Sequence, residues 1–188
     1  MSTRAVDVSF EDVSYSYPSG VDAVRGVSLH VPAGQRLAVV GRNGAGKTTL
    51  VLHLNGIFRP TRGTVRVGGE STEGRDIADL ARDVGYVFQN PDEQLFARSV
   101  RGDVALGPRN LGLTGDEVEA AVVEALEQVG LADRADHHPY TLSLSERKLV
   151  ALASVLAMRT PVVVLDEPTT GQDERGVRTV ARIVTELA

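Results

Sequence analysis

The chain has 188 residues, a length that predicts one domain, or one domain with a small subdomain. It contains no cysteine, which excludes disulfide bonds, thiolate metal sites and cysteine nucleophiles, and its net charge of −5 disfavours a generally basic protein that coats nucleic acid. The first ten residues lack the apolar centre of a signal peptide, and the longest apolar stretch is too short to span a bilayer. These features predict a soluble, cytoplasmic chain.

The first half of the chain reads as short strands followed by a buried strand and a helix. Apolar residues alternate over the first forty residues, with turn sequences containing proline and glycine at 18–20 and 32–34. Leu37–Val40 is a continuous apolar run, which is typical of a strand buried on both faces. A helix is expected from Lys47 to about Asn55.

The second half combines strands with a helical insert. Short strands are predicted at 64–67, 84–88 and 162–165, and a last helix is predicted at 174–187. Between about 90 and 158 the apolar spacing becomes helical. The sequence therefore predicts an α/β fold with a mostly parallel sheet, antiparallel strands at the N-terminus and a helical subdomain inserted into the core.

The segment Gly41–Thr48 matches the phosphate-binding pattern G-x-x-x-x-G-K-[ST] and lies between a predicted strand and a predicted helix. Glycines allow backbone N–H groups to turn toward phosphate oxygens, and the start of the following helix adds a partial positive charge. Lys47 is expected to reach the β and γ phosphates, and the Thr48 hydroxyl is expected to ligate Mg²⁺. A glycine-rich turn that binds no ligand is the alternative, and the complete motif disfavours it. The expected nucleotide-binding residues of this segment are Gly41, Asn43, Gly44, Ala45, Gly46, Lys47, Thr48 and Thr49.

Two adjacent carboxylates, Asp166 and Glu167, follow the apolar run at 162–165. Ligands of open α/β sheets bind at the carboxyl ends of the strands, the edge at which the phosphate-binding segment is also expected. Asp166 would hold Mg²⁺, and Glu167 would orient or deprotonate an attacking water. Taken alone, the pair could be two solvated carboxylates, but the phosphate-binding segment favours the functional interpretation.

The segment Asp166–Asp173, which reads DEPTTGQD, resembles the ATP-binding cassette (ABC) ATPases when it is taken together with Gly41–Thr48. Three further segments are similar to the energy-coupling-factor group of that family, the ATPases of cobalt, nickel and vitamin importers. These are Leu54–Gly63, Gln89–Phe96 and Asp103–Gly112, of which Gln89–Phe96 is the most specific. The resemblance covers essentially the whole chain. It implies one P-loop NTPase domain over residues 1–188, truncated at its C-terminal end, with the helical subdomain at about 90–158.

The resemblance implies further residue roles. Tyr17 matches the aromatic residue that stacks on the adenine ring, although Tyr15 competes for that role and Tyr17 could simply pack on its neighbour. Gln89 matches the glutamine that contacts both Mg²⁺ and the attacking water, and with Glu167 it completes the expected catalytic pair. Asp173 matches a loop aspartate that communicates across an ATPase dimer. Residues 90–96 and the helices that follow them resemble the surface that contacts a coupling helix of a membrane partner.

The chain departs from the family pattern at the signature Leu-Ser-Gly-Gly-Gln, which here is Leu142–Glu146. Ser143 remains and is expected to face the γ-phosphate bound by the opposing subunit, while Ser143 and Glu146 also form a capping box. Both glycines are replaced, by Leu144 and Ser145, and these side chains should obstruct a close backbone approach. This predicts a weakened composite site, as in a heterodimer with one strong and one degenerate site.

A second departure is that the family's γ-phosphate-sensing histidine lies beyond the helix that follows Asp173, where this chain ends. All four histidines precede Glu167 and cannot match it. The prediction is a chain that binds Mg-ATP but hydrolyses it slowly when alone.

The resemblance implies a subunit that binds and hydrolyses ATP, with Mg²⁺ as cofactor, and powers import of a metal ion or vitamin. Its implied partners are a second ABC ATPase subunit, an integral membrane coupling subunit and a substrate-binding membrane subunit, without nucleic acid. The implied location is cytoplasmic and peripheral, on the inner face of the cell membrane. The alternatives are a non-hydrolysing partner in an asymmetric dimer, a soluble ABC ATPase acting on DNA or ribosomes, and a P-loop kinase, which Glu167 and the Asp173 loop disfavour.

Overall fold

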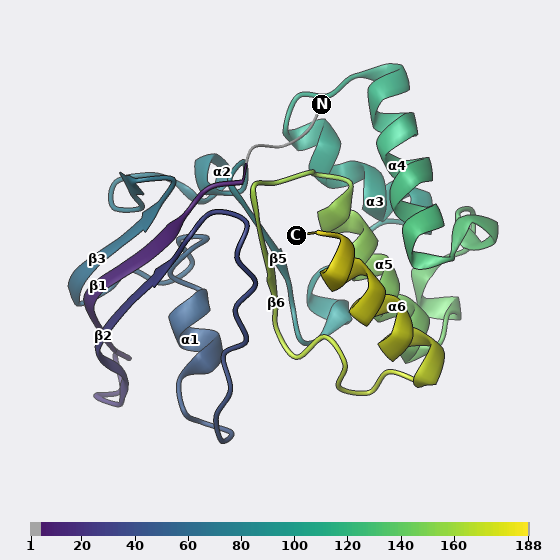
Figure 1. Cartoon of the computed structure of the whole chain (residues 1–188). Helices are drawn as coiled ribbons and strands as arrows, with labels where there is room; N and C mark the ends of the chain where they lie inside the picture. The colour runs from purple at the N-terminus through teal and green to yellow at the C-terminus, as the bar shows by residue number, and fades with distance from the viewer. Residues whose placement is uncertain (1–4, 188) are drawn as a thin grey trace. The chain divides into compact units, whose positions relative to one another are not determined.

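The computed structural model describes residues 5–187 of the chain. The chain divides into two compact units, one up to Val84 and one from Gly85 onward, and each is described by itself (Figure 1). Strands and helices occur in both units, with an antiparallel sheet in the first and a strand pair crossed over by helices in the second. The mixture confirms the predicted α/β class, whereas the prediction of a single domain stays a prediction.

The first unit is built on a four-stranded antiparallel sheet with the strand order β2-β1-β3-β4. The hairpin of β1 (Val8–Ser16) and β2 (Asp22–Val31) pairs Val8 with Val31, and β3 (Arg62–Val67) pairs with the other edge of β1. The short β4 (Glu70–Ser71) follows β3 through a tight turn. Alternating side chains of β1 and β3 point into the core, as the sequence pattern predicts. The buried apolar residues of this unit are Val8, Phe10, Val13, Val24, Leu50, Leu54, Val65, Val67, Leu80 and Val84.

The helix predicted from Lys47 to about Asn55 is shorter than expected. It is α1 (Lys47–Val51), and the following residues continue as turns whose backbone bonds span three residues instead of four. The His53 ring competes for backbone acceptors here, because its Nδ1 lies 2.7 Å from the Thr49 carbonyl and 3.2 Å from the Leu50 carbonyl, which also accepts the His53 N–H. These carbonyls are the acceptors that an α-helix would offer to the next two N–H groups. A second short helix, α2 (Ile77–Leu80), closes the unit.

The prediction of a buried strand at Leu37–Val40 is wrong in this structure. The residues have no strand conformation, and Val40 is 88 % exposed, with Leu37 and Val39 also exposed. A strand forms only where a neighbouring strand satisfies its backbone N–H and C=O groups, and the four-stranded sheet does not include this segment.

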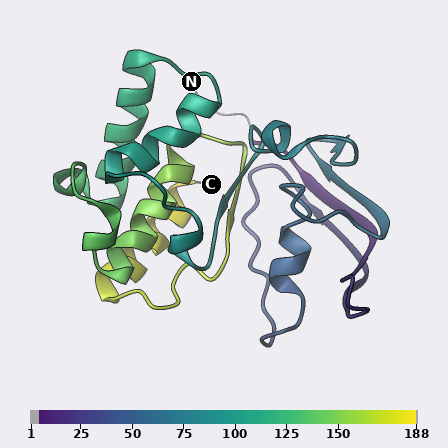
Figure 2. The same cartoon turned by 180° about the vertical axis from the view of Figure 1, so that it is seen from behind.

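The second unit joins two strands through a helical connection. β5 (Val84–Val87) pairs with β6 (Val162–Leu165), and α6 (Glu174–Glu186) follows β6 (Figure 2). The backbone N–H of Asp166 donates to the Val87 carbonyl at 3.1 Å, so the two strands end side by side. The residues that follow these strands, including Gln89 and Glu167, therefore emerge close together.

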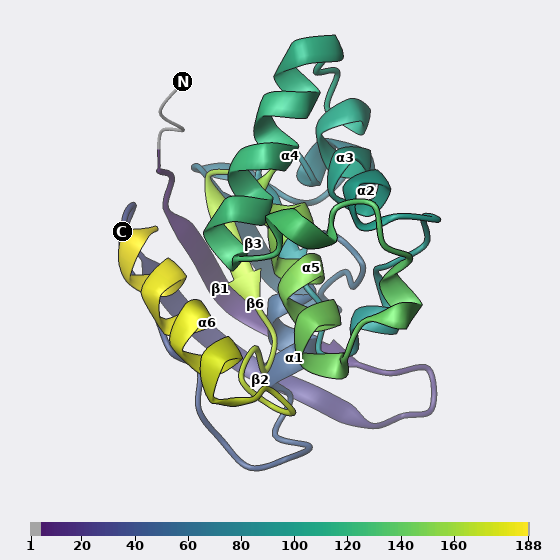
Figure 3. The ribbon, with the colours of Figure 1, turned by 90° about the vertical axis from the view of Figure 1, so that its right-hand side faces the viewer.

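Three helices between β5 and β6 pack against one another and form the larger core (Figure 3). They are α3 (Val100–Asn110), α4 (Gly115–Val129) and α5 (Leu144–Leu156). Their amphipathic spacing places valine, leucine and alanine in the contact between them, so the helical character predicted for this stretch is present. Within residues 5–187, no helix has both the length and the apolar content needed to cross a membrane.

Candidate functional site

The phosphate-binding segment lies in the first unit and leads from residue 41 into α1. Gly44 and Gly46 have φ angles of +78° and +85°, a region that favours glycine. A Cβ at Gly46 would lie 2.2 Å from the Ala23 carbonyl oxygen, so that position also needs glycine for space. The Lys47 ammonium donates to the carbonyls of Gly41 and Arg42, at 3.0 and 3.2 Å, and so turns back over the loop.

The other residues of this segment are exposed at its tip and buried at its base. Asn43, Gly44, Ala45 and Thr48 are exposed, as residues that meet a ligand must be, whereas Thr49 is buried. The hydroxyl groups of Thr49 and Tyr17 are 2.8 Å apart, which brings Tyr17 beside the segment. The loop is therefore a glycine-rich backbone turn with a lysine and a threonine hydroxyl at one end, and this arrangement fits a nucleotide phosphate.

Tyr15 and Tyr17 belong to an aromatic cluster, but they hold different places in it. The Tyr15 ring stacks on Phe58 at 4.9 Å and meets His53 edge-on at 5.2 Å. Tyr17 meets Tyr15 and Phe58 only with edge-to-face geometry. Since Tyr17 is also the residue bonded to Thr49, the structure favours Tyr17 over Tyr15 for the adenine contact, and that assignment stays a prediction.

Glu167 in the second unit is held in a defined and strained geometry. Its φ angle is +47°, which is uncommon for a residue other than glycine and is typical of functional positions. The Gln89 side-chain amide donates to its Oε2 at 2.9 Å, and the Thr170 hydroxyl donates to the same oxygen at 3.2 Å. The structure thus brings together Gln89 and Glu167, which are 78 residues apart in the sequence.

Asp166 is buried beside Glu167 and is fixed by Tyr86. The Tyr86 hydroxyl donates to Asp166 Oδ2 at 2.9 Å. Burial and the neighbouring carboxylate raise the pKa of Tyr86 well above its ordinary value. Tyr86 was not predicted as a site residue, because it looks like any strand tyrosine until the pairing of β5 with β6 places it beside Asp166.

The segment Gln89–Phe96 is held in place by its own side chains. Gln94 accepts from the Phe88 N–H at 3.1 Å and donates to the Ala151 carbonyl at 2.8 Å, so it joins the end of β5 to α5. The buried Asp103 accepts from the N–H of Phe96 at 2.7 Å. The Phe96 side chain is exposed at the end of this fixed segment.

The altered signature lies at the start of α5, and its residues hydrogen-bond with one another. Ser143 is the N-cap, and its N–H and hydroxyl both donate to Glu146 Oε2 at 2.9 Å, while its oxygen accepts from the Glu146 N–H. These bonds lower the pKa of Glu146, with the charge of Arg134 at 3.7 Å acting in the same direction. The predicted capping box is confirmed.

The two residues that replace the signature glycines both contact the loop after β6. The Ser145 hydroxyl donates to Gln172 Oε1 at 2.5 Å and lies 3.4 Å from the Asp173 N–H. Leu144 lies close to Gly171, where an added Cβ would be 3.3 Å from its Cδ2. Asp173 itself caps α6 by accepting from the Gly176 N–H at 2.7 Å.

The side chains expected to ligate Mg²⁺ lie in both units and each has suitable chemistry. The Thr48 hydroxyl, the Asp166 carboxylate and the Gln89 amide oxygen are hard ligands of the kind that Mg²⁺ prefers. Gln89 uses its nitrogen on Glu167, so its carbonyl oxygen is the atom suited to a metal. In the described residues no group of three or more His, Cys, Asp or Glu side chains could hold a metal ion.

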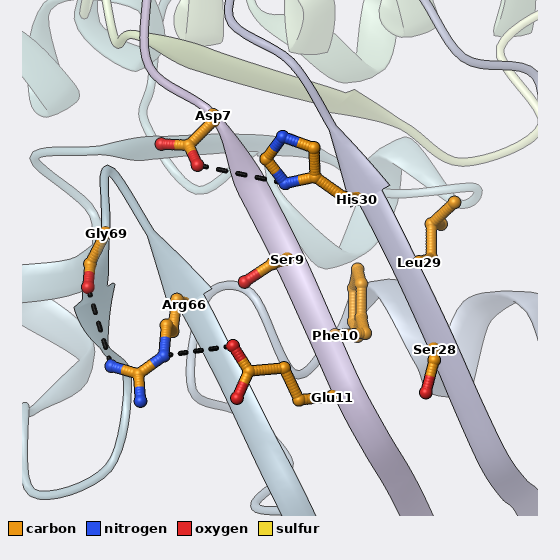
Figure 4. A pocket seen from close by; sticks show the side chains of 9 residues that line it. All are labelled: Asp7, Ser9, Phe10, Glu11, Ser28, Leu29, His30, Arg66 and Gly69. Carbon is orange, nitrogen blue, oxygen red and sulfur yellow. Dashed lines mark hydrogen bonds and ion pairs between the residues drawn. The ribbon is translucent and has the colours of Figure 1, made fainter.

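A shallow hollow of about 590 Å³ lies on the sheet of the first unit (Figure 4). Polar side chains face one another in it: Arg66 donates to Glu11 at 3.2 Å, and His30 lies 3.9 Å from Asp7. None of the sequence-predicted site residues lines it.

Comparison with known proteins identifies the family. The ABC transporter family model matches residues 24–170. The chain belongs to the ABC transporter family of ATP-binding proteins. It is 49 % identical over 183 residues to the energy-coupling factor transporter ATP-binding protein EcfA of Methanothermobacter thermautotrophicus, covering 96 % of this chain and 59 % of that protein. It is 48 % identical to a putative ABC transporter ATP-binding protein of Streptomyces avermitilis, covering 100 % of this chain and 71 % of the relative.

Solved ABC structures confirm the P-loop NTPase fold. The chain superposes on cbiO1 of Clostridium perfringens, described as part of the ABC transporter complex cbiONQ, with 35 % identity and a TM-score of 0.83, covering 98 % of this chain and 75 % of that one. It superposes on an ATP-binding cassette dimer, described as a post-hydrolysis state bound to ADP and Pi, with 25 % identity and a TM-score of 0.87, covering 96 % and 82 %. The predicted resemblance to ABC ATPases of the energy-coupling-factor type is therefore confirmed.

Proposed function

We propose that this ABC chain is an ATP-binding and ATP-hydrolysing module that powers import of a metal ion or vitamin through a membrane transporter. The observation that carries the proposal is the 2.9 Å bond between Gln89 and Glu167, at the ends of the paired strands β5 and β6. It joins the segment most typical of energy-coupling-factor ATPases to the carboxylate expected to activate water. The 49 % identity to an EcfA protein supports membership of the same group. The chain spans 59 % of the length of that protein, so the activity of the whole protein is part of this proposal.

In this proposal the phosphate-binding segment holds the ATP phosphates. Its backbone N–H groups and the Lys47 ammonium donate to the negatively charged phosphate oxygens. To do so, Lys47 gives up its hydrogen bonds to the Gly41 and Arg42 carbonyls. Tyr17, beside Thr49, offers its ring to the adenine.

Glu167 is the general base. Its carboxylate receives the proton from the attacking water, and Gln89 and Thr170 fix its orientation through one oxygen, which leaves Oε1 to face the water. Thr48, Asp166 and Gln89 would hold Mg²⁺, which supplies neutralisation of the phosphate charge.

The partners proposed for the chain are a second ABC ATPase subunit and membrane subunits, with the chain on the cytoplasmic face of the membrane. The exposed Phe96, on the fixed segment Gln89–Phe96, supplies an apolar contact for a membrane subunit. The test is co-expression with the membrane subunits of an energy-coupling-factor transporter, followed by purification and ATP-dependent uptake of radiolabelled cobalt, nickel or biotin in vesicles. Co-purification with uptake abolished by Glu167→Gln is expected, and capture of only soluble partners or nucleic acid would overturn the proposal.

A second candidate, a weakly hydrolysing partner in an asymmetric ATPase dimer, is favoured by the altered signature. The Ser143 hydroxyl donates to Glu146, so the group expected to face a γ-phosphate is engaged within the chain. Leu144→Gly combined with Ser145→Gly should raise turnover in the assembled dimer, and an unchanged rate would count against this candidate. Glu167→Gln measured in parallel reports the background rate.

A further inference from the structure

Lys148 is an unusual residue in this chain. The chain has 18 arginines and only two lysines, and the other lysine belongs to the phosphate-binding segment. Lys148 lies on α5 and is only 9 % exposed, whereas among residues 5–187 no other lysine or arginine is buried. Burial of a lysine is costly unless a charge or hydrogen bond compensates it, so its surroundings need an explanation.

The surroundings of Lys148 are the ends of the two strands that carry the proposed catalytic groups. It lines a small enclosed hollow together with Phe88, which precedes Gln89, and with Leu165 and Pro168, which flank Asp166 and Glu167. The hollow is about 10 Å³, the space of a single water at most. A compact ammonium on a thin stem fits this space better than a planar guanidinium, which accounts for a lysine in an arginine-rich chain.

A positive charge near the two carboxylates reduces their mutual repulsion. Asp166 is buried and adjacent to Glu167, and neutral groups of Tyr86, Gln89 and Thr170 donate to the two carboxylates. Like charges so close repel each other, and the repulsion is stronger in a desolvated site. Burial lowers the pKa of Lys148, while the charges of Glu167 and Asp166 act in the opposite direction and favour its ammonium form.

We propose that Lys148 is a positioning residue whose buried ammonium balances the charge of the Asp166–Glu167 pair from the α5 side. Lys148 lies beside the ends of β5 and β6 and affects hydrolysis only through the two carboxylates. The inference rests on the proposed function for the role of the two carboxylates in ATP hydrolysis. The charge balance between them and Lys148 does not require a bound nucleotide.

The primary test is a double-mutant cycle on unfolding, measured with the full chain without nucleotide. Lys148→Met is made in the parent and in the Asp166→Asn/Glu167→Gln background, and the urea midpoint is followed by the helical circular dichroism signal. Lys148→Met should lower the midpoint in the parent, since two carboxylates lose their counter-charge, and should lower it less than half as much in the neutralised background. An equal loss in both backgrounds would overturn the proposal, because it would mean that only the packing of the alkyl stem matters.

Arg147→Met is the matched control. Arg147 neighbours Lys148 on α5 and pairs with Asp92 at 3.4 Å instead of with the strand-end carboxylates. Its effect on the midpoint should be the same in both backgrounds. Lys148→Gln, run through the same cycle, replaces Lys148→Met if that variant does not fold.

Single-turnover hydrolysis gives a second readout. Lys148→Met should lower the rate by about tenfold or more, in the range seen when residues behind metal and catalytic groups are removed, with the dissociation constant for ATP changed less than twofold. Unchanged rate, or equal loss of rate and affinity, would count against a positioning role. A parent chain without any hydrolysis would overturn the proposed function instead, and the unfolding cycle would still decide the role of Lys148.

Discussion

The Glu146→Gln substitution tests the altered signature most directly. In the structure the Glu146 carboxylate accepts from both the N–H and the hydroxyl of Ser143 and lies 3.7 Å from Arg134. Glutamine keeps an amide oxygen that can close the capping box but removes the negative charge from the first turn of α5. The substitution therefore isolates the contribution of charge from that of capping geometry.

Two charge effects set the magnitude. A carboxylate in the first turn of a helix stabilises it by about 0.3–1 kcal/mol, and an exposed ion pair such as that with Arg134 adds about 0–1 kcal/mol. We expect Glu146→Gln to lower the free energy of unfolding by about 1 kcal/mol at pH 7. Glu146→Ala, which also removes the capping bonds of Ser143, should cost about 2 kcal/mol.

The pH dependence has a definite sign. The pKa of Glu146 is lowered in the folded chain, mainly by the bonds from Ser143. The charge therefore stabilises the fold fully above the unfolded pKa of about 4.5, and the contribution is lost as the pH falls through the folded pKa.

Urea unfolding of parent and Glu146→Gln at pH 7 and below pH 4 is the assay. The difference in unfolding free energy should close at the lower pH. A difference that is the same at both pH values would refute the reasoning, as would a Glu146→Gln variant as stable as the parent at pH 7.

Three other predictions concern single side chains. Gly46→Ala should lose more stability than Gly44→Ala in thermal unfolding, because both have positive φ but only at Gly46 does the new Cβ meet a β2 carbonyl at 2.2 Å; equal losses would contradict this. Tyr86→Phe should cost about 1.5–3 kcal/mol in denaturant unfolding, the value of a hydrogen bond to a charged group such as Asp166, and an unchanged midpoint would show that this bond contributes nothing. Burial lowers the pKa of His53, so stability should fall as the pH drops below 6.5, by up to about 1.4 kcal/mol per pH unit; His53→Gln, which cannot titrate, should show a flatter pH profile, and identical profiles would exclude His53 as the cause.

Features that are formed within one short segment of the chain were predictable from the sequence. The phosphate-binding pattern at 41–48 depends on backbone turns that only glycine adopts, and Gly46 has the positive φ that such a turn requires. The capping box of Ser143 and Glu146 involves four successive residues, and its bonds are those that the pattern predicts.

The contacts around the carboxylates were not predictable, because they join distant segments. Tyr86 reaches Asp166 across 80 residues, and Ser145 reaches Gln172 across 27. Nothing local distinguishes Tyr86 from a strand tyrosine, or Ser145 from an exposed helix residue, until the strand order places them. The burial of Lys148 belongs to the same class, since only the packing of α5 on the strand ends creates the hollow that it lines.

The sequence by itself determined the family, the phosphate-binding segment and the carboxylate pair, since each is encoded in consecutive residues whose backbone and chemistry are local. Tertiary structure alone decided which groups hold that pair, and it corrected two local predictions. The helix α1 ends at Val51, earlier than predicted, where the His53 ring contacts the carbonyls of Thr49 and Leu50. The run Leu37–Val40 has the composition of a buried strand but lies exposed. Its apolar side chains set a propensity, whereas a strand exists only where a second strand supplies the hydrogen bonds.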